Sequence, residues 1–226
     1  MATRGTSGGP RKPRERYGDE MAGIVREMIL SGTLSAGERI DQDGLAESHG
    51  MSRLPVREAL IALEKEGLVI NTQRRGAYVA RLEPEDVLDQ YEVYGLVAGI
   101  AAARAAERLT AEELIALRAA HERFAKARGA AAKESANDDF HRIINRVCGR
   151  RLRSLLSLLA SSLPSHHYMF DPQWSALAGQ HHQRILEAIE RRDVVGARQA
   201  MVDHLVASGR EAVVALRSKG FWPAGT

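Results

Sequence analysis

The sequence predicts a mainly α-helical chain built from two domains, and three observations support this prediction. Two helix-like segments separated by a tight turn come first, and two short strand-like runs follow them. After Arg81 the strand signal ends, and helix start and stop signals divide the remaining residues into helices. With 226 residues, of which 44% are hydrophobic, the chain is long enough for two modest cores.

The most informative segment is MSRLPVREAL at residues 51–60. Ser52 is a residue type favoured at a helix N-cap, and Pro55 falls in the first helical turn, where a missing N–H donor costs little. A helix is therefore predicted to begin here. Residues 43–49 form a shorter predicted helix before it, and Gly50 provides the tight turn between the two.

This second helix has two different faces. Val56, Leu60 and Leu63 recur at the spacing of one face, whereas Arg53 and Arg57 lie four residues apart on another. The apolar face is expected to pack in the core, which leaves the arginine face able to meet DNA. The alternative is that the two arginines are solvated charges on a helix surface.

Two short strands, residues 68–70 and 77–80, are predicted after this helix. The segment between them ends in Arg74, Arg75 and Gly76, a flexible basic tip suited to a groove or a phosphate. The helix, turn, helix and strand pair together predict a winged helix-turn-helix.

The stretch from about Asp19 to Arg81 resembles the GntR superfamily of bacterial transcription regulators. The motifs AGERI, LAESHGMSRLPVREAL, LEKEGLV and RRGAYVA support the resemblance, which implies a regulator that binds double-stranded DNA. Some relatives carry an arginine where this chain has Asp43, so a different sequence preference is expected. By resemblance, the residues expected to contact DNA are Ser52, Arg53 and Arg57 in the recognition helix, and Arg74, Arg75 and Gly76 at the wing.

Composition sets limits on the remaining possibilities. The net charge is only +3, so bulk charge alone does not indicate nucleic acid. Residues 1–16 are rich in Gly, Pro and Arg and are expected to form a disordered basic arm. No run approaches the roughly 18 apolar residues of a membrane span, so a cytoplasmic protein without a membrane partner is expected. The lone Cys148 excludes an intramolecular disulfide.

Residues 17–81 are assigned to the winged helix-turn-helix domain and residues 83–220 to a helical domain. In the second domain Thr110 and Glu113 predict a capping box, and Asp193 is expected to cap the last helix. The fold class predicted for this domain is an antiparallel six-helix bundle. Its helices are expected over residues 83–109, 110–127, 131–148, 150–163, 174–191 and from 194 onward.

The histidines provide the chemistry of the helical domain. His141 follows Asn137 by one helical turn, so both side chains project from one face of the predicted helix. His182 opens the apolar stripe of the fifth helix, and His204 lies on the sixth. If these helices converge, the imidazoles and one oxygen donor form a site for a divalent metal such as zinc or nickel. The alternative is that each histidine is a hydrogen-bonded core residue.

The helical domain resembles the FCD ligand-binding domain of the FadR subfamily of GntR regulators, and its six helices look more like the VanR-type branch. The resemblance implies a metal site of one aspartate and three histidines. These positions fall on Asn137, His141, His182 and His204. Because Asn137 offers an amide oxygen without a charge, weaker affinity or a different metal is expected.

The same resemblance implies a homodimer and a small carboxylate effector held near the metal. Binding of the effector is expected to change operator affinity, with relief of repression as the expected outcome. The residues expected to line the effector pocket are Tyr94, Asp138, Arg142 and Tyr168. The alternative function is a helical metal-dependent enzyme that uses the three histidines and a bound water, although it leaves the winged helix unexplained.

Overall fold

The computed structural model describes residues 14–161, 172–218 and 220–222. The chain separates into two compact units, with the division between Leu82 and Glu83. The predicted class, mainly α-helical with a small antiparallel wing, is confirmed. Residues 1–13 of the expected basic arm lie outside the described residues. Helix α1 (Arg14–Leu30) begins before residue 17, so the expectation of disorder is wrong for residues 14–16, which are Arg and Glu, both good helix formers.

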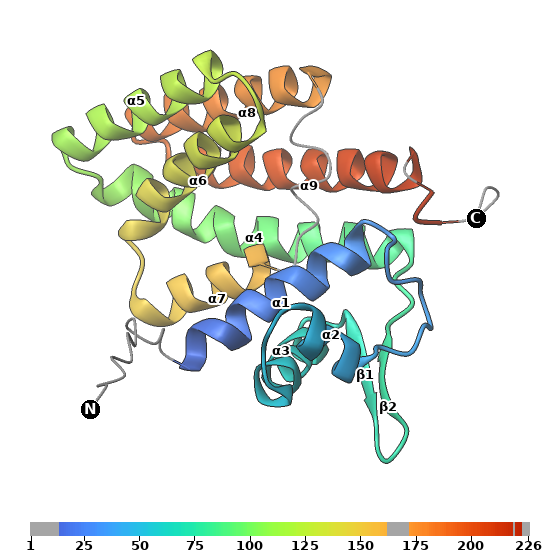
Figure 1. Cartoon of the computed structure of the whole chain (residues 1–226). Helices are drawn as coiled ribbons and strands as arrows, with labels where there is room; N and C mark the ends of the chain where they lie inside the picture. The colour runs from blue at the N-terminus through green and yellow to red at the C-terminus, as the bar shows by residue number, and fades with distance from the viewer. Residues whose placement is uncertain (1–13, 162–171, 219, 223–226) are drawn as a thin grey trace, which may run out of the picture. The chain divides into compact units, whose positions relative to one another are not determined.

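The N-terminal unit is a winged helix-turn-helix, as predicted (Figure 1). The two strands pair in an antiparallel hairpin, with Val69 opposite Val79 and Thr72 opposite Gly76. The elements that follow α1 are α2 (Gln42–Ser48), α3 (Arg53–Lys65), β1 (Val69–Thr72) and β2 (Gly76–Val79).

Helices α1 and α3 form the core of this unit. The sequence reasoning assigned no element to α1, although its buried residues recur at helical spacing. An ion pair also joins α1 to the C-cap of α3, since Arg26 donates to both carboxylate oxygens of Glu66 at 2.9 and 2.8 Å. The residues that fill the core, each no more than 2% exposed, are Met21, Val25 and Ile29 of α1 and Val56, Leu60 and Leu63 of α3.

The segment before α2 runs beside the second strand of the wing. Arg39 forms an antiparallel bridge with Tyr78. Both edges of β2 are therefore hydrogen-bonded, one to β1 and the other to residues 37–40. The backbone N–H···O bonds of the second edge, each 2.9 Å long, run from Gly37 to Val79, from Val79 to Glu38 and from Ile40 to Ala77.

Capping residues set the positions of the two helices of the helix-turn-helix. Asp41 Oδ1 accepts bonds from the backbone N–H groups of Asp43 and Gly44, each at 3.1 Å, and so fixes the start of α2. Ser52 occupies the N-cap of α3 as predicted, but its hydroxyl makes no capping bond. After α3, Gly67 has φ of +76°, the left-handed conformation that favours glycine at a helix end.

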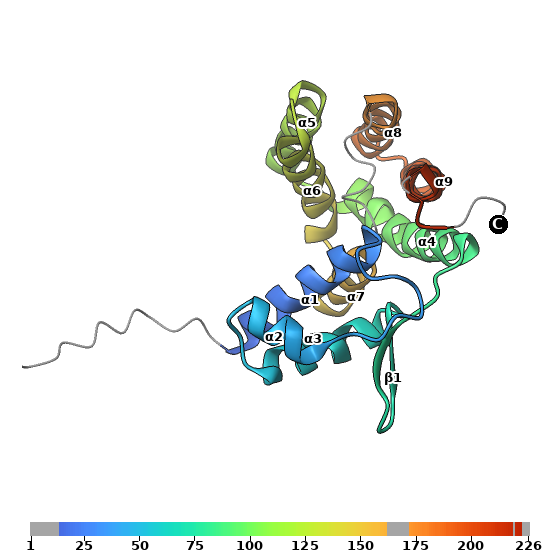
Figure 2. The same cartoon turned by 45° about the vertical axis from the view of Figure 1, so that its right-hand side comes forward.

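The C-terminal unit is a helical bundle, as predicted (Figures 1 and 2). Thr110 and Glu113 form the predicted capping box, and Asp193 Oδ1 accepts the N–H of Gly196 at 2.8 Å as the predicted cap of the last helix. Its helices within the described residues are α4 (Pro84–Arg108), α5 (Ala111–Lys126), α6 (Ala130–Arg146), α7 (Arg150–Ser161), α8 (Pro172–Glu190) and α9 (Val194–Ser218).

The fourth helix of this unit, α7, is described as far as Ser161. Its predicted end, at residue 163, lies outside the described residues. None of the described helices is both long and apolar enough to cross a membrane. In the bundle, α5 packs against α6 and α8 packs against α9 (Figure 2).

Helices α4 and α9, each 25 residues long, pack along one another through small residues. A Cβ atom at Gly99 would lie 3.1 Å from the backbone oxygen of Arg198. A Cβ atom at Gly209 would lie only 2.7 Å from Cβ of Tyr91, which is itself buried. Glycine is therefore required at these positions because the helix backbones approach too closely for a side chain.

We expect Gly209→Ala to destabilise the helical domain, because the added methyl group must displace the Tyr91 side chain, whose Cβ atom would lie 2.7 Å away. Overpacking costs about 1–3 kcal/mol, against a gain in helix propensity of up to about 1 kcal/mol, so unfolding should become easier by roughly 1–2 kcal/mol. Thermal unfolding followed by circular dichroism measures the change. The control is Gly179→Ala on α8, where the nearest atom, on Phe124, is 3.9 Å away, and its stability should be equal or higher. Equal melting of both variants would contradict the proposed close approach.

Candidate functional site

The N-terminal unit has a groove of about 760 Å³ between α2, the start of α3 and the wing. It brings together arginines that are far apart in the sequence, along with the first residue of β2. The polar residues and the glycine that line it are Arg39, Asp41, Gln42, Asp43, Arg53, Arg57 and Gly76. A concave surface with several guanidinium groups suits an anionic partner such as the DNA backbone.

Of the predicted recognition-helix residues, Arg53 and Arg57 line this groove. Ser52, Arg53 and Arg57 are all exposed at the N-terminal end of α3. Arg53 is held by Asp43 of α2, with Arg53 Nε 2.6 Å from Asp43 Oδ1 and Arg53 Nη2 2.8 Å from Asp43 Oδ2. Arg57, one helical turn after Arg53, makes no ion pair among the described residues.

The predicted wing residues lie at the turn between β1 and β2. Arg74 and Arg75 are exposed, and Arg74 has a left-handed backbone with φ of +61°. The N–H of Arg75 donates to the carbonyl of Thr72 at 3.0 Å, and the hydroxyl of Tyr78 donates to the carbonyl of Arg75 at 3.2 Å. These bonds fix the tip, so both arginine side chains start from a defined backbone.

Arg39 is a groove residue that the sequence reasoning missed. Its guanidinium lies against the wing, where a Cβ atom at Gly76 would be 3.3 Å from Arg39 Nε. Gly76 has φ of +103°, so both its conformation and the nearby arginine favour glycine there. Arg39 belongs to the AGERI motif, but the motif alone does not show where its side chain lies. The pairing of residues 37–40 with β2 brings Arg39 to the wing.

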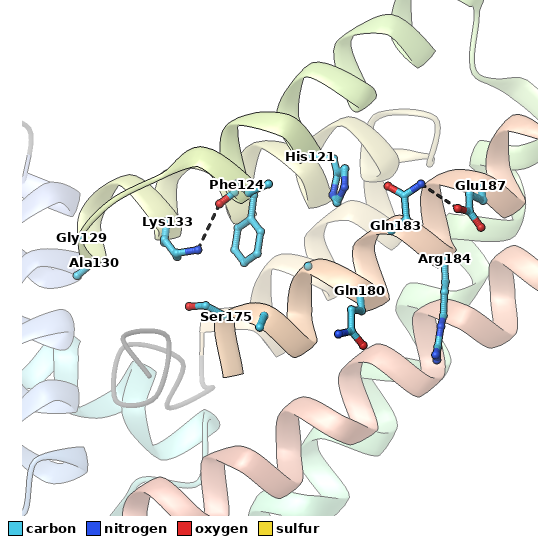
Figure 3. Close-up of a pocket in the computed structure, with 13 residues that line it drawn as sticks. His121, Phe124, Gly129, Ala130, Lys133, Ser175, Gln180, Gln183, Arg184 and Glu187 are labelled. Carbon is cyan, nitrogen blue, oxygen red and sulfur yellow. Dashed lines mark hydrogen bonds between the residues drawn. The ribbon is translucent and has the colours of Figure 1, made fainter. Parts of the chain in front are cut away.

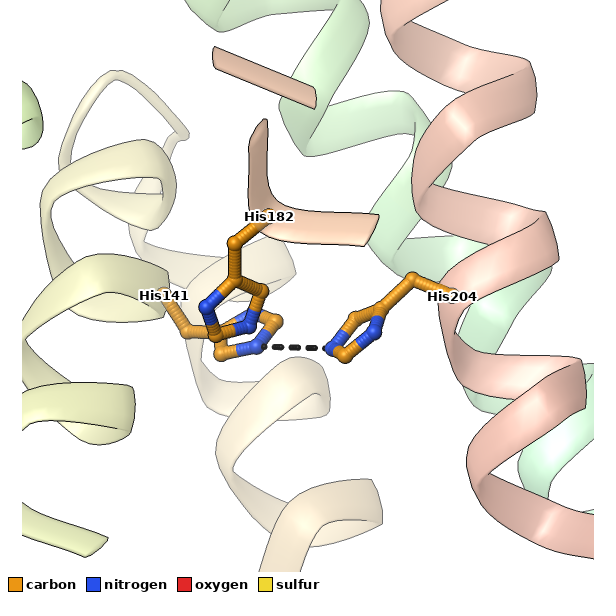
Figure 4. Close-up of side chains that lie close together, drawn as sticks. All are labelled: His141, His182 and His204. Carbon is orange, nitrogen blue, oxygen red and sulfur yellow. Dashed lines mark hydrogen bonds between the residues drawn. The ribbon is translucent and has the colours of Figure 1, made fainter. Parts of the chain in front are cut away.

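In the C-terminal unit, the structure brings His141, His182 and His204 together from α6, α8 and α9 (Figure 4). One nitrogen from each ring lies within 4.8 Å of the other two. The Nε2 atoms of His141 and His204 are 3.3 Å apart, close enough for a hydrogen bond. Within the described part of the chain, no carboxylate or thiol joins this group.

Burial keeps these imidazoles neutral. It lowers the pKa of His141 to about 4. Burial, with help from the neighbouring histidines, also holds the pKa values of His182 and His204 well below the ordinary value. His182 is fully buried, and among the described residues neither of its ring nitrogens has a hydrogen-bond partner. The alternative of hydrogen-bonded core histidines therefore does not describe His182, because such orphaned polar atoms are costly.

Aromatic rings surround the cluster. Phe140 stacks on His182 with ring centroids 4.3 Å apart, and Phe124 lies 4.8 Å from the same ring. His121 of α5, which the sequence reasoning did not assign, has its ring centroid 6.5 Å from that of His182. Burial lowers the pKa of His121 as well. The cluster therefore lies in an apolar environment that strengthens electrostatic interactions.

The arrangement fits a divalent metal. Two imidazole nitrogens bound to a tetrahedral zinc at about 2.0–2.1 Å lie roughly 3.3 Å apart, the same as the separation of His141 Nε2 and His204 Nε2. The unpartnered nitrogens of His182 provide a third donor. Asn137 is half-buried one turn before His141 on α6, whereas the neighbouring carboxylate of Asp138 is exposed.

The described residues predicted to line the effector pocket do not all line one cavity. Tyr94 is buried in α4, where burial, with the nearby charge of Asp138, raises its pKa to about 12. Asp138 and Arg142 are exposed on α6 and line a shallower hollow of about 450 Å³, with Arg142 paired to Asp139. Tyr168 lies outside the described residues.

A cavity of about 990 Å³ in the helical domain lies between α5, the start of α6 and α8 (Figure 3). His121 and Phe124 form one side of it and also border the histidine cluster. Lys133 reaches over the ring of Phe124 at 4.8 Å, and Arg184 and Gln183 project from α8. An apolar wall with a few polar groups and cations is typical of a small-molecule site.

Known proteins with this arrangement are regulators of transcription. The family described as bacterial regulatory proteins, gntR family, matches residues 18–79, and the FCD domain matches residues 89–207. The chain therefore belongs to the GntR-family transcriptional regulators that carry an FCD domain. It is a DNA-binding regulator, and the alternative of a metal-dependent enzyme is not supported, because the families and relatives are regulators.

Individual relatives cover most of the chain. It is 28% identical over 194 residues to an uncharacterised HTH-type transcriptional regulator of Mycobacterium tuberculosis, covering 85% of this chain and 80% of that protein. It is 24% identical over 204 residues to the HTH-type transcriptional repressor RspR of Escherichia coli, covering 85% and 87%. Among solved structures, E. coli McbR/YncC has the same fold, with a TM-score of 0.66, 21% identity and coverage of 89% and 97%.

Proposed function

We propose that this regulator is a homodimeric repressor that releases its operator when a small carboxylate binds to the helical domain. The observation that supports operator binding is the groove at the start of α3, where Arg39, Arg53 and Arg57 converge. Repression is favoured because RspR, a relative that matches along most of the chain, is itself a repressor.

The proposed DNA contacts follow the position of each side chain. Helix α3 enters the major groove, where Ser52, Arg53 and Arg57 lie near its N-terminal end. Arg74 and Arg75 reach the adjacent backbone from the wing, and Gly76 allows the wing to approach closely. A homodimer presents two such units to an operator with two-fold symmetry.

We expect Arg57→Ala and Arg53→Ala each to weaken binding to a duplex selected from a random-sequence library. Loss of one arginine contact to DNA costs roughly 1–3 kcal/mol, so affinity should fall about 5-fold to 150-fold, measured by fluorescence anisotropy. Lys65→Ala is the matched control, because it removes one positive charge from the other end of the same helix. Unchanged affinity in both arginine variants would overturn the DNA-contact assignment.

The proposed metal centre consists of His141, His182 and His204, with Asn137 as a candidate oxygen donor. A bound divalent cation would supply a positive charge beside the effector cavity, behind His121 and Phe124. The protein residues keep three neutral imidazoles in an apolar environment, and Phe140 holds the ring of His182 by stacking. Because the lowered pKa values keep these rings unprotonated, they are ready to act as ligands.

We expect the purified, untagged protein to hold about one equivalent of zinc, nickel or manganese, and His182→Ala to lose it. Elemental mass spectrometry measures the content. The matched control is His181→Ala, which removes the adjacent imidazole on α8 but no member of the three-histidine group. Equal metal content in the His182 variant and the wild type, or none in either, would overturn the metal assignment.

The cavity between α5 and α8 is the proposed effector site. Its volume lies in the range of small-molecule pockets, which is roughly 300–1,000 Å³. Lys133 and Arg184 provide positive charge for a carboxylate, and Phe124 provides an apolar surface for the rest of the molecule. His121 and Phe124 separate this cavity from His182, so an effector here can alter the packing around the metal ligands.

We expect a panel of small mono- and dicarboxylates to contain compounds that raise the melting temperature of the wild-type protein and weaken its DNA binding. Lys133→Met should reduce the affinity of those compounds by about tenfold, because it removes a charge-assisted contact. Lys126→Met, an exposed lysine on α5 that does not line the cavity, is the control. The same response in both variants would place the effector elsewhere.

The proposed mechanism is a shift between populations. Effector binding favours arrangements of the dimer in which the two winged units no longer match the half-sites of the operator. A preference of about 1.4 kcal/mol for such arrangements lowers operator affinity tenfold. A modest displacement of helices in the C-terminal domain is therefore sufficient.

A further inference from the structure

The Asp43–Arg53 ion pair has a geometry that bears on sequence recognition. It is bidentate, with Arg53 Nε and Nη2 bound to separate oxygens of Asp43 at 2.6 and 2.8 Å. Both side chains are mostly exposed, 74% for Arg53 and 63% for Asp43. Exposed ion pairs contribute little to folding stability, so stability does not explain this one. It lies instead at the mouth of the groove proposed to receive DNA.

The pair occupies one edge of the guanidinium and leaves another edge available. Arginine has five N–H donors, and Asp43 uses one on Nε and one on Nη2. The hydrogens that remain on Nη1 and Nη2 form a second fork. Such a fork matches the O6 and N7 acceptors that guanine presents in the major groove.

The charge of the pair disfavours a phosphate contact. Asp43 neutralises Arg53, and its carboxylate is repelled by a phosphate that approaches the same guanidinium. Arg57, one turn further along α3, makes no ion pair among the described residues and keeps its full positive charge. Arg57 is therefore suited to the DNA backbone, whereas Arg53 is suited to a base edge.

The positions of Asp43 and Arg53 on their helices also favour the ion pair in the free protein. Asp43 lies in the first turn of α2, where its N–H donates to Asp41 Oδ1 at 3.1 Å. Arg53 is the first residue of α3, directly after the turn of the helix-turn-helix. A guanidinium already fixed by two bonds loses less conformational entropy when it binds a base.

We propose that Asp43 is a positioning residue for sequence recognition: it orients Arg53 to read one guanine in each half-site and keeps Arg53 from the phosphates. This inference rests on the proposed binding of α3 to DNA. It assigns selectivity among base pairs to the Asp43–Arg53 pair and sequence-independent affinity to Arg57.

The test begins with selection of duplexes from a random-sequence library by the wild-type chain. Wild type should select a guanine at one position in each half-site, and replacing that guanine should weaken binding by about fivefold or more. In Asp43→Ala this preference should fall to about twofold or less. Affinity for an unselected duplex should rise, and the logarithmic salt dependence should steepen by roughly one charge. Arg53→Ala should lose the preference at the same position.

Two further variants make the test specific. Glu47→Ala removes one negative charge from α2 without touching the pair, so it should raise general affinity and retain the guanine preference. Asp43→Asn, which keeps the shape but not the charge, should lie between Asp43→Ala and wild type. Circular dichroism melting checks that each variant is folded.

The possible failures are distinguishable. If Asp43→Ala retains the guanine preference, or if Arg53→Ala and Asp43→Ala change different positions, the positioning role is overturned. If wild type selects no sequence, or if both Arg53→Ala and Arg57→Ala bind DNA as tightly as wild type, the proposed contacts between α3 and DNA are overturned. The positioning role of Asp43 falls with them.

Discussion

The close packing of α4 against α9 is the constraint on which the helical domain depends. Gly95, Gly99 and Gly209 let the two backbones approach, and α9 carries His204 into the cluster. A wider spacing between these helices would move His204 away from His141, whose Nε2 atom is 3.3 Å from that of His204. The geometry of a site built from polar side chains is thus determined by residues that have no side chain at all.

The apolar surroundings of the three-histidine cluster determine how strongly its ring nitrogens interact with a partner. Phe124, Phe140 and neighbouring helices exclude water from His182, whose two ring nitrogens have no hydrogen-bond partner in the described part of the chain. In such an environment an unsatisfied nitrogen is costly, and a favourable electrostatic contact is correspondingly strong. The aromatic residues that raise the free-energy cost of the unsatisfied nitrogens therefore also favour binding of a metal ion that imidazole can coordinate.

Local signals predicted most of the fold, and distant contacts account for what was missed. The Thr110 capping box and the Asp193 cap depend on residues within one helical turn, and both form as predicted. The convergence of three histidines was also accessible, because helical spacing puts each on an inward stripe. Arg39 and His121 could not be placed this way, since each joins its site through a segment remote in sequence. The effector-pocket residues could not be predicted from the sequence either, because helical spacing does not show which helix faces enclose a cavity.

The pairing of residues 37–40 with β2 has a consequence for the behaviour of the protein in concentrated solution. An unpaired strand edge can recruit an edge from another molecule and start an intermolecular sheet. Here β2 lies between β1 and the 37–40 segment, so its backbone donors and acceptors are used within the chain. The wing, which we propose contacts DNA, can therefore project from the domain while its second strand offers no template for aggregation.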